Sequence, residues 1–347
     1  MKKIGIFIAV ITVFFGCKKQ DISRLQDHFT LRNQGADMPI WVEGNLNSNA
    51  MVIFVHGGPG GDGQIYNTYL QEFSDKMESE FAMVYWDQRA SGNSTGNFNS
   101  SKYNVETYVA DLEKLIDVLK LRYGNARSIF ILGHSWGGTL ITAYAIDASR
   151  QAKIKGFIEV DGAHDFKSVD VLVNRFKQIG NEQILLGNHV TEWNDIVDYC
   201  NQVDPNNATD EQITKLNGYG FTAEQYLVNA GFIVNESGTV NIPKYQFNGS
   251  LHFPLSWWNS TITNKGMYNE LKNADYTAQM NAIKIPSLFL WGRWDMVVPR
   301  ASGISGFVSC GAADKKYKEF DQSGHSPMIN QMQDFVNELV PWVKARK

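Results

Sequence analysis

The stretch SIFILGHSWGG, residues 128–138, constrains the fold of this chain more than any other feature. An apolar run leads into Ser135, which has Gly133 two positions before it and Gly137 two positions after it. The pattern G-x-S-x-G is typical of a sharp turn from a buried strand into a helix, where crowding admits only small neighbours. Residues 139–148 have the composition of a helix, so the motif lies between a strand and a helix, as this turn requires. We therefore expect Ser135 to be a nucleophile at a helix N-terminus, in the positive end of the helix dipole.

Apolar runs alternate with helical segments on both sides of this motif. Between Val105 and Leu119 apolar residues recur at helical spacing, and the runs typical of buried strands cover residues 50–55, 81–86, 128–132 and 154–160. Such alternation predicts a mostly parallel sheet covered by helices on both faces. The pattern stops between residues 165 and 280 and returns with strands at 285–291 and 317–320 and a closing helix at 334–343.

This alternation predicts one α/β domain with an inserted segment. The core is expected at residues 29–164 and 281–347, and residues 165–280 are expected to form a helical lid inserted after the sixth strand. With 43% apolar residues, the chain has enough material for a large core.

The first 17 residues, MKKIGIFIAVITVFFGC, indicate a targeting segment rather than part of the fold. Two lysines precede an apolar run that is too short to span a bilayer comfortably. The ending Gly16-Cys17 resembles the lipobox of bacterial lipoproteins, which implies lipidation of Cys17, a polar tether at residues 18–28, and membrane anchoring in the bacterial cell envelope facing the periplasm. An ordinary secretory signal or a short uncleaved anchor is the alternative.

A serine nucleophile needs a base, and the base needs a carboxylate that orients it. In sheets of this kind the expected chain order is serine, acid, histidine, with each residue at the carboxyl end of a strand. Asp295 follows the strand at 285–291, and His325 lies in the loop before the closing helix. Asp161, which follows the preceding strand, is the alternative acid, and His164 is the rival base. His134 is expected to support packing only.

The loop after residues 50–55 reads HGGPGGDG, and it allows two interpretations. Its GPGGDG portion matches the dinucleotide-binding pattern G-x-G-x-x-G, with Asp87 placed where a ribose-binding acid would be expected. A nicotinamide oxidoreductase is therefore one alternative. Pro59, however, has no N–H to offer a pyrophosphate, and that interpretation gives no task to the serine, acid and histidine.

As part of a hydrolase, the same loop would supply half of an oxyanion hole. One donor is expected from the backbone N–H of Trp136, the residue after the nucleophile, and the other from Gly58. Three further residues, His56, Asp87 and Arg89, are expected to support the loop rather than touch substrate.

Five motifs together resemble the proline iminopeptidase family of α/β-hydrolases: HGGPGG at 56–61, DQRASGNS at 87–94, GHSWGG at 133–138, WGRWD at 291–295 and SGHSP at 323–327. The resemblance implies the α/β-hydrolase fold, catalytic roles for Ser135, Asp295 and His325, and release of an N-terminal residue, often proline, from short peptides. Relatives recognise the substrate amine with lid glutamates, some in a W-x-x-W-E string. The insertion lacks that string, and its candidate acids are Glu182, Glu192, Glu211 and Glu224.

Composition excludes several other classes of protein. The net charge is −4, and acidic and basic residues are interspersed along the chain, so no basic stripe indicates a nucleic-acid-binding protein. Neither an H-E-x-x-H string nor paired Cys or His at ligand spacing occurs, so we expect no metal and no cofactor. Cys200 and Cys310 could form one bridge in an oxidising compartment. The expected partner is a small peptide or acyl substrate, and the sequence does not indicate the oligomeric state.

The function predicted is therefore that of a serine aminopeptidase. An esterase or amidase acting on another small acyl substrate is the nearest alternative, because it would use the same three residues. A lipid-anchored binding protein that has lost catalysis is a further alternative.

Overall fold

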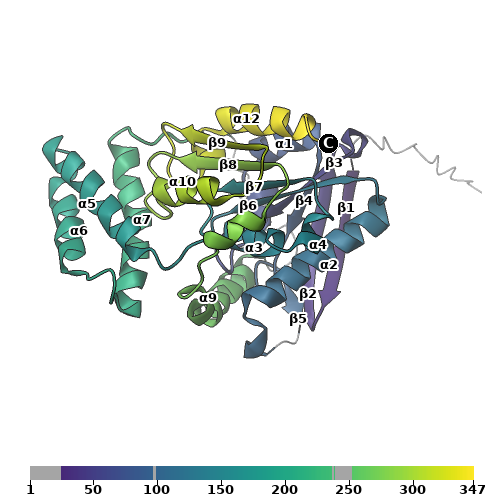
Figure 1. The fold of residues 1–347 in the computed structure, drawn as a ribbon, viewed down its shortest axis with the longest axis horizontal. Coiled ribbons are helices and arrows are strands. Elements are labelled where there is room, and N and C mark those ends of the chain that lie inside the picture. Colours follow the sequence, from purple (N-terminus) through teal and green to yellow (C-terminus); the bar gives the residue numbers. More distant parts are fainter. Residues whose placement is uncertain (1–24, 97–98, 237, 239–251) are drawn as a thin grey trace, which may run out of the picture.

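The computed structural model describes residues 25–96, 99–236, 238 and 252–347 (Figure 1). In this part of the chain a nine-stranded sheet has the order β1-β2-β4-β3-β6-β7-β8-β9, with β5 paired to β2. The strands are β1 Leu25–Asn33, β2 Ala36–Gly44, β3 Ala50–Val55, β4 Ala82–Trp86, β5 Thr95–Gly96, β6 Ser128–His134, β7 Gly156–Val160, β8 Ser287–Gly292 and β9 Lys315–Phe320.

All pairings from β4 through β9 along this order are parallel, whereas β1 and β2 pair antiparallel at one edge. Every residue of β3, β4, β6, β7 and β8 is buried. Burial on both faces explains why these strands are near-continuous apolar runs rather than alternating ones. The predicted α/β-hydrolase architecture, a mostly parallel sheet flanked by helices, is confirmed.

Two hydrophobic clusters cover the two faces of the sheet. Phe130 and Leu132 of β6 face the cluster shared with helices α1 (Gln71–Glu80) and α12 (Met332–Lys344). Ile129 and Ile131 face the opposite cluster, which includes α2 (Val105–Tyr123) and α3 (Trp136–Ala145). Three other helices are α4 Ala148–Gln151, α10 Arg300–Ser309 and α11 Pro327–Asn330. Parallel strands place their carboxyl ends at one edge, and the loops that carry the candidate site gather there.

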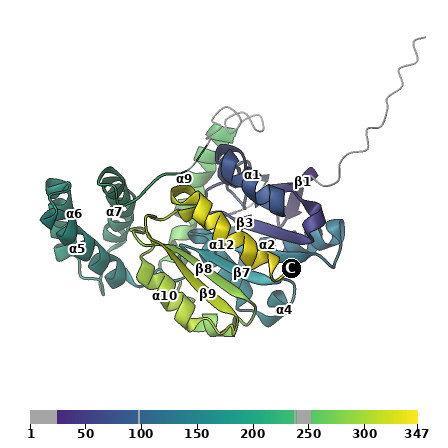
Figure 2. The ribbon, with the colours of Figure 1, turned by 90° about the horizontal axis from the view of Figure 1, so that it is seen from above.

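In the described residues, four α-helices lie between β7 and β8: α5 Val169–Leu185, α6 Val190–Gln202, α7 Asp210–Asn229 and α9 His252–Leu271. Helices α5, α6 and α7 stand to one side of the sheet (Figures 1 and 2) and share a hydrophobic cluster of their own. Trp294 and Met296, from the loop after β8, belong to that cluster and attach it to the core. The short β5 aside, the insertion follows the sixth strand. Its action as a lid stays a prediction.

The N-terminal expectations concern residues outside those described. Residues 1–17 with Cys17, and residues 18–24 of the expected tether, are not covered. Residues 25–28, which the sequence analysis assigned to the tether, are the start of β1 and pair with β2. Among the described helices, none combines the length and the apolar character that crossing a membrane requires. Cys200 and Cys310 are both buried, and both are free thiols.

Candidate active site

Ser135 occupies the turn between β6 and α3. Its backbone has φ 56° and ψ −122°, a region that is costly for a residue with a side chain. Hydrogen bonds hold the turn on both sides: the Ser135 N–H donates to Val160 O at 3.1 Å, and the Ser135 carbonyl accepts from Gly138 N at 2.8 Å and Ala163 N at 3.0 Å. The strain therefore persists because neighbouring strands fix the backbone around it.

The glycines around Ser135 are required by space. A Cβ on Gly133 would lie 2.3 Å from Gly137 O, and one on Gly137 would lie 2.0 Å from Val55 O. Across the site, a Cβ on Gly57 would come within 3.1 Å of Ser135 Cβ. The chain from β3 thus passes directly over the serine, and side chains at these positions would push the two loops apart.

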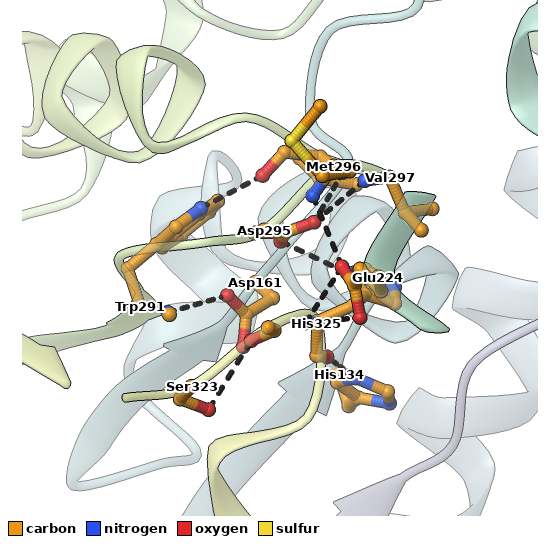
Figure 3. A network of polar contacts seen from close by, with 12 residues as sticks. His134, Asp161, Glu224, Trp291, Asp295, Met296, Val297, Ser323 and His325 are labelled. Carbon is orange, nitrogen blue, oxygen red and sulfur yellow. Dashed lines mark hydrogen bonds and ion pairs between the residues drawn. The ribbon is translucent and has the colours of Figure 1, made fainter. Parts of the chain in front are cut away.

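Asp295 and His325 meet at the carboxyl ends of β8 and β9 (Figure 3). His325 Nδ1 donates to Asp295 Oδ2 at 2.9 Å, and Asp295 Oδ1 accepts from the N–H groups of Val297 and Val298, each at 2.8 Å. These bonds fix the carboxylate and put the imidazole proton on Nδ1. Burial by itself lowers the pKa of His325, but the nearby charges of Asp295 and Glu224 outweigh it, so the pKa is raised above its usual value.

His134 fixes the backbone of His325. Its Nε2 lies 2.7 Å from the His325 carbonyl, and its Nδ1 lies 2.9 Å from the Tyr66 hydroxyl. Because a carbonyl only accepts, Nε2 carries the proton and Tyr66 donates to Nδ1. Burial, with the neighbouring His325, lowers the pKa of His134 to about 3, so this ring stays neutral. We expected only packing from His134, and the structure adds a hydrogen bond.

Because His134 precedes Ser135, its contact with His325 brings the base loop next to the serine. Within the described residues no hydrogen bond joins the Ser135 hydroxyl to the His325 ring. Catalytic hydrogen bonds are often long in unliganded enzymes, so this does not exclude the pair. The assignment of Ser135 as nucleophile remains a prediction.

Gln88 connects the two expected oxyanion loops. Its side-chain oxygen accepts from the Trp136 indole at 2.9 Å, and its side-chain nitrogen donates to His56 O at 3.0 Å. The His56 ring closes this network, with Nδ1 donating to Gly57 O at 2.7 Å and Nε2 accepting from Gln88 N at 3.3 Å. Gln88 carried no signal of its own in the sequence, although it lies within the DQR string that carried the family resemblance.

Of the two expected donors, Trp136 is bonded into this network, and Gly58 follows Gly57, whose carbonyl belongs to it. Trp136 opens α3, where a backbone N–H has no acceptor within the helix. Gly58 has φ +127°, and a Cβ there would lie 2.6 Å from Gly60 N, so only glycine fits. Their action as an oxyanion hole stays a prediction.

Asp87 and Arg89 follow β4, and both are buried. The Asp87 carboxylate accepts from Gly63 N and from Asn93 N, each at 2.8 Å, which joins the HGGPGGDG loop to the next one. A carboxylate so enclosed is not presented to a ribose, which counts against the dinucleotide interpretation. Arg89 makes a bidentate ion pair with Asp111 of α2, with N–O distances of 2.8 and 2.9 Å. This pair secures α2, a task that the sequence analysis did not anticipate.

Glu224 of α7 is the acid that sequence reasoning could not rank. Its carboxylate accepts from Met296 N at 3.0 Å and from His325 N at 3.0 and 3.1 Å (Figure 3). A Cβ on Gly220 of α7 would lie 2.6 Å from Met296 O, and one on Gly324 would lie 2.3 Å from Glu224, so the helix packs very closely here. Burial, then Asp295, raises the pKa of Glu224 to about 7.

The other three candidate acids of the insertion behave differently. Their side chains are exposed on α5, α6 and α7: Glu182, Glu192 and Glu211. The amino-acid sequence alone cannot tell these four acids apart. Only the packing of α7 against the loops after β8 and β9 separates Glu224 from the rest.

Asp161 and His164, the alternative acid and the rival base, both follow β7. Asp161 is fully buried, and its Oδ1 accepts from Gly292 N at 2.9 Å. One side-chain ligand atom each of Asp161, Asp295 and His325 lie within 4.8 Å of one another, so the alternative acid lies beside the expected one. His164 Nδ1 instead pairs with buried Glu159 at 2.8 Å, and its ring packs against Gly306 of α10.

The chain also resembles proteins of known family. The family described as serine aminopeptidase, S33, matches residues 47–201. A probable aminopeptidase, YbaC of Bacillus subtilis, is 23% identical over 84% of this chain and 88% of its own length. A proline iminopeptidase of Chitinophaga pinensis is 26% identical over 88% of this chain and 93% of its own length.

Solved structures share the fold. An α/β fold family hydrolase from Bacillus anthracis superposes with a TM-score of 0.56 at 17% identity, covering 93% of this chain and 99% of the other. The esterase RhEst1 from Rhodococcus gives a TM-score of 0.55 at 15% identity, covering 94% of this chain and all of its own. Together with the sequence relatives, these likenesses show that the chain has the α/β-hydrolase fold and resembles the proline iminopeptidases over most of its length.

Proposed function

We infer that this hydrolase is a serine aminopeptidase that releases N-terminal, proline-like residues from short peptides through an acyl-enzyme on Ser135. The observation that carries the proposal is the convergence of Ser135, on its strained turn, with the hydrogen-bonded pair His325–Asp295 at one sheet edge. The relatives named as proline iminopeptidases support the choice of substrate.

Two half-reactions follow from this arrangement. His325 Nε2, left free because Nδ1 bonds to Asp295, takes the Ser135 hydroxyl proton while the oxygen attacks the peptide carbonyl. The backbone N–H groups of Trp136 and Gly58 stabilise the oxyanion, and the imidazolium then protonates the departing amine. Water, deprotonated by the same imidazole, then attacks the ester. The imidazolium returns that proton to the Ser135 oxygen as the acyl–oxygen bond breaks, and the N-terminal residue leaves as a free acid.

An esterase or amidase with the same three residues is the second candidate. The absence of the W-x-x-W-E string favours it, as does the Glu224 carboxylate, which is engaged by backbone N–H groups. Turnover of a proline arylamide should be compared with that of the same amide acetylated on its imino nitrogen and with that of an acetyl ester. We expect the free-amine arylamide to be cleaved fastest. Cleavage of the ester alone would contradict the peptidase proposal.

A fluorophosphonate probe separates these enzymes from a protein that has lost catalysis. Such probes label an activated serine irreversibly, so we expect labelling of the wild-type chain and none of Ser135→Ala. Absence of labelling in the wild type would favour a non-catalytic binding protein, and saturable NAD(P) binding would favour an oxidoreductase.

The proposed place of action is the bacterial cell envelope, with the chain anchored to a membrane through lipidated Cys17. The support is the apolar run that ends in Gly16-Cys17. Metabolic labelling with a fatty-acid analogue, followed by fractionation, tests the proposal. Label should enter the wild type and be lost in Cys17→Ala, whereas a soluble, unlabelled wild-type chain would contradict it.

A further inference from the structure

Asp161 is a buried acid that the proposed reaction does not use. It ends β7 with φ 44°, and its side chain has no solvent exposure. Its N–H donates to Leu290 O at 3.1 Å and its Oδ1 accepts from Gly292 N at 2.9 Å, so β8 holds it on two sides. Within the described part of the chain, its second oxygen, Oδ2, has no hydrogen-bond partner.

The neighbour of this carboxyl group is another carboxylate. Asp161 and Asp295 present oxygens within 4.8 Å of each other and of His325. The two oxygens of Asp295 are already committed as acceptors, Oδ1 to two backbone N–H groups and Oδ2 to the imidazole. All three partners are donors, so both oxygens of Asp295 act as acceptors.

Ionising both of two adjacent buried carboxyl groups costs free energy, and so does a buried polar atom without a partner. A proton on Asp161 Oδ2 removes both costs, because the carboxylic acid then has a hydrogen to donate towards Asp295. We propose that Asp161 is protonated and donates a hydrogen bond to Asp295, which makes it a positioning residue for the carboxylate that orients His325.

The surroundings of Asp161 favour the protonated form. Burial first, and then the charge of Asp295, raise the pKa of Asp161 well above its usual value, with Glu224 of α7 adding to the effect. The other titratable groups here are Tyr317 of β9, which senses the charges of both aspartates, and His325. Arg175 of α5 is a cation that acts on Asp295.

This proposal rests on the proposed function where it concerns catalysis. In the protonated state, Asp161 keeps Asp295 in line with His325. When alkaline pH removes its proton, a second negative charge faces Asp295, and the acceptor geometry around the imidazole is lost. We therefore expect turnover to fall at alkaline pH through ionisation of Asp161.

Two substitutions distinguish a protonated Asp161 from an ionised one. Asp161→Asn mimics the protonated form, because its amide donates to Asp295 and its oxygen accepts from Gly292 N. Asp161→Ala removes both bonds. We expect the alanine variant to lose about tenfold or more in kcat, the cost of a hydrogen bond to a charged group. The asparagine variant should recover to within about threefold and lose the alkaline fall. If Asp161→Asn is as impaired as Asp161→Ala while both remain folded, the ionised form is needed and the proposal is wrong.

Infrared spectroscopy tests the proton without any turnover. The difference spectrum between wild type and Asp161→Asn should contain the C=O stretch of a protonated carboxyl group. It is recorded above pH 7, so that Glu224 is ionised, and below the alkaline fall in turnover. Glu224→Gln should retain that band. Its absence from the wild type would overturn the proposal whether or not the chain is a peptidase. Conversely, if the band is present but the chain has no peptidase activity, Asp161 is still shown to be protonated, and only the proposed substrate is rejected.

Discussion

Ser135 and His325 are held in place by opposite means. The serine is held by the backbone: hydrogen bonds with Val160, Ala163 and Gly138 surround it, and glycines let neighbouring strands approach closely. The histidine depends on side chains from distant segments, with Asp295 on its ring, His134 on its carbonyl and Glu224 on its N–H. Backbone groups and close packing thus hold the nucleophile, whereas side chains from distant segments hold the base.

This difference predicts that substitutions around the two residues have different effects on folding and on catalysis. Substitutions near Ser135 disturb backbone packing, so they should affect folding and chemistry together. Substitutions around His325 remove single hydrogen bonds from an intact fold, so they should affect chemistry first. Four experiments test this contrast, starting with the largest expected effect.

Removal of either partner should abolish turnover. Ser135→Ala lacks the attacking oxygen and His325→Ala lacks the base, and in serine hydrolases each loss costs about 10⁶ in kcat. We expect both variants to keep the wild-type melting temperature within a few degrees, since each substitution shortens a side chain and keeps the backbone. The double variant should be no worse than either single one. Appreciable turnover in Ser135→Ala would place the nucleophile elsewhere.

Asp295→Asn should reduce kcat by about 10⁴, because the amide stabilises the wrong tautomer of His325. Its effect on pH dependence has a definite sign. The base must be neutral, so activity falls as pH drops through the raised pKa of His325. Without the charge of Asp295, burial lowers that pKa, and the acidic limb of kcat/KM should move to lower pH. Near-normal activity in Asp295→Asn would instead make Asp161 the orienting acid.

Gly137→Ala tests the close backbone packing of the elbow. The new Cβ would lie 2.0 Å from Val55 O, so we expect a loss of about 2 to 3 kcal/mol in unfolding free energy, together with loss of turnover. Gly218→Ala is the matched control, because no atom lies within 4 Å of a Cβ at that helical position. The control should gain about 1 kcal/mol from helix propensity. Denaturant titration measures both, and equal stabilities would show that the elbow can relax.

Glu224→Ala tests the distant support of the base. The variant leaves the N–H groups of His325 and Met296 without their acceptor, so we expect about a tenfold loss in kcat. The unfolding free energy should change less than in Gly137→Ala. Asp195→Ala, an exposed acid on α6, is the charge-matched control and should behave as wild type. A rise in KM with unchanged kcat would assign Glu224 to substrate binding rather than to positioning.

The strands and the elbow were predictable because their signals are local. Buried parallel strands read as apolar runs, and the spacing of Gly133, Ser135 and Gly137 reflects one turn of chain. The order of Ser135, Asp295 and His325 was also predictable, since strand ends of one sheet share an edge. The start of β1 at Leu25 was not, because its alternation of exposed and half-buried residues lies in a polar segment.

The amino-acid sequence by itself determined the sheet, the serine turn and the order of the expected acid and base, because each follows from residues close together or from the direction of strands. Tertiary structure alone decided the partners of these groups. It separated Glu224 from three exposed acids, joined the expected oxyanion loops through Gln88, and brought Asp161 next to Asp295. Such contacts join segments far apart in the chain, and burial gives them their effect on charge, so no local pattern encodes them.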